Sequence, residues 1–262
     1  MTESSLTAVV RLMQALTAVA SFVLALELRV MLRAGVIDGA WPAATLRRTW
    51  GWRARLMTPS VFGAVPVVQG AAAALLLMSA ILPRMAPLST AATVILMLLS
   101  WLTAVRVRGT MNGGSDGMLF TVLLGLTLAT WPNASDPVHA GGVVYVAAQL
   151  LLSYVRAGLV KCRERAWWNG NALRAFLELP AYAVPHWVPR SQWLLCVASI
   201  GVIGFELAAP AALIDPRTCL IYTAVAWCFH LATALLFGLN RFLLAWSAAL
   251  PSLWVAVQLV HR

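Results

Sequence analysis

The stretch AGGVVYVAAQLLLSYVRAGLVKCRERAWWNGNA, residues 140–172, decides the fold. It begins as an apolar helix of membrane-spanning length and then turns basic and aromatic, as the end of a span does at the headgroup level. Lys161 lies at this change and is the only lysine, since the other 18 of the 19 Lys and Arg residues are arginines. Because arginine keeps its proton, Lys161 is the one cationic side chain that can act as an amine base.

Composition predicts an integral membrane protein. Of the 262 residues, 61% are hydrophobic and only 11% are charged, and the mean hydropathy is +0.82, far above an ordinary globular domain. We therefore expect a single all-α transmembrane domain over residues 1–262, a bundle of about eight helices. The apolar runs place these helices near 12–32, 61–82, 88–106, 117–131, 141–161, 192–213, 219–238 and 241–260.

The polar segments between the helices predict an interfacial segment and the orientation of the chain in the membrane. The loop at about 162–191 is too polar and too rich in proline to span, so we expect a short amphipathic helix lying in the interface. All but four of the 19 cationic residues fall on odd-to-even helix connections. This bias predicts that both termini lie outside and that the basic loops face the cytoplasm, in a bacterial cytoplasmic membrane. The net charge of +10 then indicates contact with the lipid bilayer rather than with nucleic acid.

Tyr154, Gly158 and Lys161 follow one stripe of the fifth expected helix, at i, i+4 and i+7. A small residue between a phenol and an amine leaves room for a flat ligand. Lys161 could instead simply anchor the helix end by snorkelling to the interface. Three arginines nearby already supply such anchoring, and their charge favours the uncharged amine. They are Arg156, Arg163 and Arg165.

Further polar residues occur where the membrane makes them costly. Glu206 fits an interhelical salt bridge, a protonated acid or a catalytic group, and His230 fits an interhelical hydrogen bond or a base. The segment MNGGSDGML holds Asn112, Ser115 and Asp116, which could bind a polar head or simply begin the next helix. The four cysteines show no ligand spacing, so we expect neither a metal site nor a disulfide.

Three segments together resemble the HTTM family, the transmembrane domain shared by vitamin K-dependent gamma-carboxylase and bacterial relatives. They are YVRAGLVKCRERAWWNGNAL at 154–173, FELAAPAALIDPRT with FHLATALLFGLNRF within 205–242, and MNGGSDGML at 111–119. In size and in the NGGSD segment the chain is similar to the standalone bacterial type represented by sporulation-delaying protein B. Where carboxylases of the family carry a histidine, the matching positions here are Gly114 and Ser115.

The resemblance implies an enzyme that modifies or matures a small peptide, with a soluble helper protein as a further partner. In the family, a lysine deprotonates reduced vitamin K or another hydroquinone. O₂ converts this cofactor to a strong base, and CO₂ adds to the resulting peptide carbanion. Carried over, Lys161 would be the base and His230 a second catalytic residue. Tyr154, Gly158, Asn112, Ser115, Asp116 and Glu206 would line the cofactor site.

Two readings without chemistry stand beside the lyase-type enzyme. In the first, the protein is a membrane scaffold, or an immunity or export partner for a secreted peptide, and the buried polar residues only hold helices together. In the second, it binds a lipid or a quinone without converting it. The enzyme requires Lys161 to be withdrawn from bulk water beside a quinone-sized apolar cavity. A protein that only binds would show the cavity with an amine that points away from it.

Overall fold

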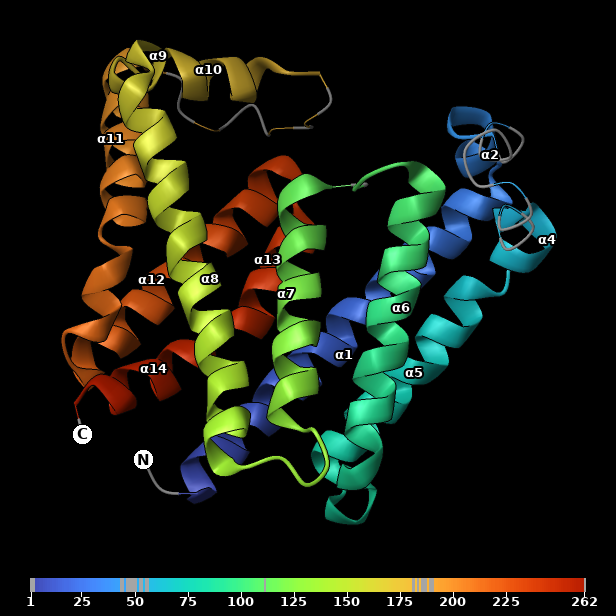
Figure 1. The fold of residues 1–262 in the computed structure, drawn as a ribbon. Helices are drawn as coiled ribbons and strands as arrows, with labels where there is room; N and C mark the ends of the chain where they lie inside the picture. The colour runs from blue at the N-terminus through green and yellow to red at the C-terminus, as the bar shows by residue number, and fades with distance from the viewer. Residues whose placement is uncertain are drawn as a thin grey trace. The chain divides into compact units, whose positions relative to one another are not determined.

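The computed structural model describes residues 3–42, 45, 51, 54, 57–110, 112–180, 182, 184, 188 and 191–261. All regular structure in these ranges is helical, which confirms the all-α fold class. The chain divides into two compact units, Thr2–Val143 and Val144–Arg262. Figure 1 shows the order of the helices along the chain.

Four long helices build the first unit. They are α1 (Glu3–Arg33), α5 (Val65–Ile81), α6 (Ser89–Val107) and α7 (Gly113–Ala129). Each packs on its neighbours in the series, and α7 returns to α1 (Figure 1). The shorter elements are α2 (Val36–Ala40), α4 (Pro59–Phe62) and the 3₁₀ helix η2 (Pro83–Leu88).

Helix α8 (Asp136–Arg163) begins in the first unit and continues into the second. Its first turns pack tightly on α7 at Gly142. A Cβ atom at Gly142 would lie against the carbonyl oxygen of Gly125 and 2.7 Å from the Ala129 nitrogen. Only glycine allows the two backbones to come this close.

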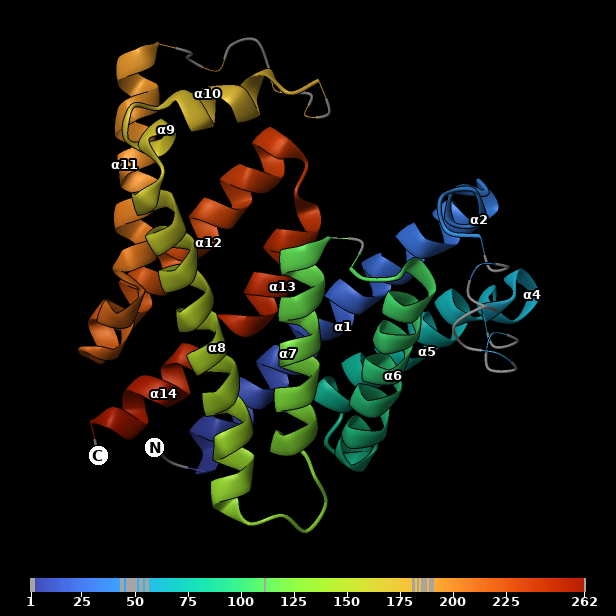
Figure 2. The same cartoon turned by 45° about the horizontal axis from the view of Figure 1, so that its top comes forward.

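The second unit contains the rest of α8 and the helices that follow it: α9 (Arg165–Trp168), α10 (Asn171–Glu178), α11 (Gln192–Leu207), η3 (Ala209–Leu213), α12 (Pro216–Phe237), α13 (Asn240–Ala249) and α14 (Ser252–Val260). In Figures 1 and 2, α8 and α11 lie side by side and run in opposite directions, and α10 crosses the end of α11.

Gly170 fixes the α9–α10 segment on α11. Its φ is +77°, a left-handed conformation that glycine adopts without strain. A Cβ atom here would lie 2.6 Å from the backbone nitrogen of Cys196 and 2.7 Å from the carbonyl carbon of Leu195. The position therefore requires glycine twice, for its conformation and for the close approach.

Six helical segments of the described chain are long and apolar enough to cross a membrane, which is consistent with an integral membrane protein. They are Glu3–Arg33, Pro59–Ile81, Pro83–Val107, Asp136–Arg163, Pro216–Phe237 and Asn240–Val260. The other two expected helices, Gly113–Ala129 and Gln192–Leu207, are present but shorter. All eight expected helices therefore exist, while a count of eight spans stays a prediction.

The helix boundaries differ from the sequence expectation in several places. The expected helix 61–82 is divided into α4 and α5, and the expected helix 192–213 into α11 and η3. The first helix starts near the N-terminus, at Glu3 rather than near residue 12. The last expected helix is two helices, α13 and α14, separated at Leu250 and Pro251. Proline has no backbone N–H to donate, so it interrupts the helical hydrogen bonds and becomes the N-cap of α14.

Candidate functional site

The C-terminal end of α8 and the end of α11 are joined by an ion pair between Lys161 and Glu206. The Nζ atom of Lys161 donates to both carboxylate oxygens of Glu206, at 2.6 and 2.8 Å. Only 18% of the lysine side chain and 6% of the glutamate side chain are exposed. The salt bridge that the sequence left as one alternative for Glu206 is therefore present.

An aromatic ring covers the amine of Lys161. The Nζ atom lies 5.1 Å from the ring centroid of Trp167, on α9, within the range of a cation–π contact. The neighbouring Trp168 donates from its indole N–H to the backbone oxygen of Cys162, 2.8 Å away, which fastens α9 to the end of α8. The interfacial segment thus closes over the only lysine.

The space beside Gly158 is filled by α11. A Cβ atom at Gly158 would lie 2.9 Å from Leu207 Cγ and 3.2 Å from Glu206 Cβ. The sequence interpretation had left this space for a flat ligand. In the structure the small residue instead lets α8 and α11 approach, and this approach brings Glu206 within reach of Lys161.

Two turns before Lys161, α8 carries Tyr154, which is buried and hydrogen-bonded to His230 on α12. The phenol oxygen and His230 Nε2 are 2.7 Å apart, and both side chains are almost fully buried. Tyr154 also makes edge-to-face contacts with Phe205 and Tyr222, at centroid distances of 5.3 and 5.9 Å. The interhelical hydrogen bond that the sequence offered as one role for His230 is therefore present.

Buried polar atoms without a protein partner gather around this pair. Within the described part of the chain, Tyr222 Oη, His230 Nδ1 and Trp246 Nε1 are buried and make no hydrogen bond. The rings of His230 and Trp246 are 5.1 Å apart, and the ring of Phe205 stacks on Tyr222 at 5.3 Å. Such orphaned groups are uncommon in protein interiors and call for a polar partner. We refer to Tyr154, Phe205, Tyr222, His230 and Trp246 as the aromatic cluster.

Phe205 and Glu206 are consecutive residues of α11, so the aromatic cluster adjoins the Lys161–Glu206 pair. The sequence interpretation found Tyr154, Glu206 and His230 but missed Tyr222 and Trp246. A signal for Tyr222 exists in the buried stripe of α12, Cys219, Tyr222, Ala226, His230 and Ala234, with its steps of three and four residues. No pattern in the sequence singled out Trp246.

Asn112, Ser115 and Asp116 form the start of α7 in the first unit. The side chain of Asp116 accepts a hydrogen bond from the backbone N–H of Asn112 at 3.0 Å, and Ser115 donates to the Asn112 carbonyl at 3.4 Å. This is the helix-starting role that the sequence gave as the alternative to ligand binding. Their part in a cofactor site stays a prediction.

A second ion pair, between the buried Arg106 and the partly exposed Asp38, lies in the first unit and was not expected. Arg106 at the end of α6 is only 1% exposed, and its guanidinium donates to Asp38 and to the carbonyl oxygen of Trp41. It also lies 5.7 Å from the ring centroid of Phe62. The sequence counted Arg106 among the cations at the helix connections, and it lies in the last turn of α6, at the start of such a connection. Of the other expected loop cations, Arg47, Arg48, Arg53, Arg55 and Arg190 lie outside the described residues.

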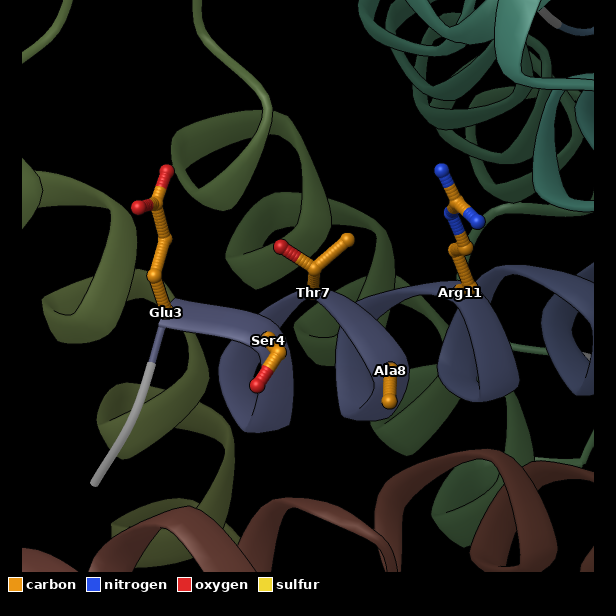
Figure 3. Close-up of a pocket in the computed structure, with 5 residues that line it drawn as sticks. All are labelled: Glu3, Ser4, Thr7, Ala8 and Arg11. Atoms are coloured by element: carbon orange, nitrogen blue, oxygen red, sulfur yellow. The ribbon is translucent and has the colours of Figure 1, made fainter.

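The beginning of α1 carries a shallow surface hollow lined by Glu3, Ser4, Thr7, Ala8 and Arg11. Figure 3 shows Glu3, Thr7 and Arg11 pointing to the same side of the helix. All five residues come from one helix, so no second element encloses a ligand there. The chemistry of this hollow is that of a polar helix end, which suits the water boundary of a membrane span.

Comparison with known proteins gives one match. Residues 129–254 match the family model described as HTTM domain. The match covers the second unit from its first residue to the beginning of α14, including Lys161, Glu206 and the aromatic cluster. Neither the curated proteins nor the solved structures yield a match.

Proposed function

We propose, from the match of residues 129–254 to the HTTM domain model, that this chain is a membrane enzyme of the gamma-carboxylase-like kind. Its substrate is a small peptide, and its cofactor is a hydroquinone such as reduced vitamin K. Lys161 is the base. The observation that carries the proposal is the buried pair of Lys161 and Glu206 beside the aromatic cluster, because it combines a proton acceptor with low water access.

A proton transfer within the ion pair would produce the base. In this proposal one proton moves from Lys161 Nζ to Glu206, which replaces the two opposite charges by two neutral groups. The oxygen-to-nitrogen distances of 2.6 and 2.8 Å permit this transfer without movement of the helices. Lys161 is then a neutral amine that can accept a proton, and Glu206 holds the displaced one.

The aromatic cluster has the composition of a site for a flat ring with two oxygens. Stacked and edge-on rings provide apolar walls, and Tyr222, His230 and Trp246 hold unpaired polar atoms that can bond to such oxygens. His230 accepts from or donates to Tyr154, so the state of one fixes the hydrogen-bonding role of the other. When bound, the hydroquinone would supply, with O₂, the strong base that a peptide carbon requires before CO₂ adds.

The test compares Lys161→Arg with wild type. Purified full-length protein in lipid nanodiscs receives reduced vitamin K, O₂ and isotopically labelled CO₂ with a glutamate-containing peptide, and mass spectrometry follows loss of the hydroquinone and label in the peptide. Arginine preserves the charge facing Glu206 but cannot release its proton, so we expect at least about a hundredfold slower hydroquinone loss.

Arg163→Lys is the matched control, because it makes the reverse exchange on the same helix end. We expect it to retain wild-type turnover. Wild-type turnover by Lys161→Arg would rule out Lys161 as the base.

One observation favours the non-enzymatic scaffold as the second candidate. Two direct contacts join α8 to its neighbours. Lys161 bonds to Glu206 on α11, and Tyr154 bonds to His230 on α12. If this is their whole role, replacing the ion pair by apolar side chains, Lys161→Met with Glu206→Leu, leaves peptide export or immunity intact. Under the enzyme proposal the same double variant folds but is inactive.

A further inference from the structure

A hollow of about 370 Å³ lies in the first unit, away from any residue of the proposed site in sequence. It is formed where the end of α1 meets α2, α4 and the start of α5. Its polar lining comes from Arg29, Arg33 and Asp38, and its remaining lining includes Leu32, Pro66 and Val67. The two arginines are four residues apart on α1 and therefore occupy one helix face.

Positive charge predominates in the lining of this hollow. Among the described residues no carboxylate pairs with Arg29 or Arg33, and the one lining acid, Asp38, is already bonded to Arg106. Residues 28–115 contain nine arginines and no acid other than Asp38. The positive charges of Arg29 and Arg33, at i and i+4, repel each other. An anion bound between them would reduce this repulsion, which no carboxylate among the described residues reduces.

The apolar part of the lining indicates where the anion comes from. Val67 is 60% exposed, and on the same stretch of α1 Val30 is 65% and Leu26 is 49% exposed. These side chains belong to candidate membrane spans, so in a bilayer they face acyl chains. Arg29 and Arg33 occupy the last two turns of the α1 span, where long cationic side chains reach the headgroup level.

We infer that this hollow binds the phosphate of an anionic phospholipid, with Arg29 and Arg33 on the phosphate oxygens and one acyl chain against Leu32 and Val67. Guanidinium groups match phosphate geometry and bind it by paired hydrogen bonds. A zwitterionic headgroup adds a cation to a site that already has two, so phosphatidylglycerol binds better than phosphatidylcholine.

Native mass spectrometry of the full-length protein in detergent tests this, with phosphatidylglycerol, phosphatidylcholine and inorganic phosphate as probes. Wild type is expected to retain phosphatidylglycerol over phosphatidylcholine and to keep it in millimolar inorganic phosphate. The double variant Arg29→Gln/Arg33→Gln is expected to lose phosphatidylglycerol affinity by about tenfold or more. Arg84→Gln, which removes an exposed arginine in η2 of the same unit, is the control and should bind as wild type does.

Three results would overturn the inference. The first is equal phosphatidylglycerol binding by the double variant and by wild type. The second is an equal loss in Arg84→Gln, which would indicate general charge attraction instead of a site. The third is displacement of the lipid by inorganic phosphate, which would assign the two arginines to a soluble phosphate. Circular dichroism and thermal unfolding of each variant establish that binding is compared among folded proteins.

Discussion

Glu206 is the counter-ion of Lys161 in the second unit. Replacing it by glutamine keeps its shape but leaves the ammonium, only 18% exposed, without a counter-ion. Breaking a largely buried ion pair from one side is strongly destabilising, so we predict that Glu206→Gln lowers the free energy of unfolding by about 2 kcal/mol. Equilibrium unfolding in mixed detergent micelles measures this change.

The double replacement Lys161→Met with Glu206→Leu completes the thermodynamic cycle. Because it removes both charges together, we expect its free energy of unfolding to lie within about 1 kcal/mol of wild type. If Glu206→Gln were as stable as wild type, the amine would not depend on this carboxylate.

At the residue scale, the sequence pointed to Lys161 through its uniqueness but could not provide its partner. Lys161 and Glu206 are 45 residues apart, and only the packing of Gly158 against Leu207 brings them together. Arg106 shows the same limit, because its position at a helix end suggested a loop cation while its contacts with Asp38 and Trp41 bury it. Such pairings depend on tertiary structure, which local pattern does not contain.

At the element scale, Gly170 is expected to control the docking of α9 and α10 on α11. Gly170→Ala adds a Cβ atom 2.6 Å from a backbone nitrogen of Cys196 at a φ of +77°, so we predict a loss of at least about 3 kcal/mol in the free energy of unfolding. Faster maleimide labelling of Cys196, located by peptide mass spectrometry, would accompany it, because this cysteine contacts the backbone oxygen of Trp168.

Gly238 gives a matched control for this substitution. It ends α12 with a similar φ of +67°, but a Cβ atom there would meet nothing within 4 Å. Gly238→Ala should therefore cost only the conformational term of about 1 kcal/mol. An equal loss of unfolding free energy in the two variants would show that the close approach at Gly170 does not contribute to stability.

The start of α12 depends on Asp215, which caps the helix and precedes Pro216. The hydroxyl and backbone N–H of Thr218, with the backbone N–H of Arg217, lower the pKa of Asp215 below its ordinary value. A lowered folded-state pKa means that the ionised cap stabilises the fold above the ordinary aspartate range. This contribution is lost as the pH falls through the lowered pKa.

We therefore predict that Asp215→Ala has a lower melting temperature than wild type at neutral pH and that the difference shrinks in acid. Melting curves of the two proteins at a series of pH values test this. A difference that stays constant into strong acid would show that the carboxylate charge is not involved.

Helices were the most predictable part of this chain, because apolar runs of membrane length leave little choice. All eight expected runs are helical, and the 162–191 loop contains α10 as an amphipathic helix. The division of the last run into α13 and α14 could have been anticipated from Pro251. The aromatic cluster could not, because its members come from α8, α11, α12 and α13 and meet only through packing.

At the scale of the whole molecule, the distribution of arginine predicts the orientation in the membrane. By the sequence prediction, only four of the 19 cationic residues fall on the side expected to hold both termini, so we predict that this side faces away from the cytoplasm. In a bacterial host, alkaline phosphatase fused after residue 262 should be active, and the same enzyme inserted after Glu164 should be inactive. The reverse pattern would show that the orientation is inverted.

We propose that Lys161, which is paired with Glu206, lies beside a bound quinone-type cofactor. Because the chain has a single lysine, ¹⁵N-lysine labelling gives one side-chain amine resonance, free of overlap. We predict that this resonance shifts on Glu206→Gln and, in wild type, shifts again when vitamin K quinone is added. A resonance that neither the substitution nor the quinone moves would contradict the account.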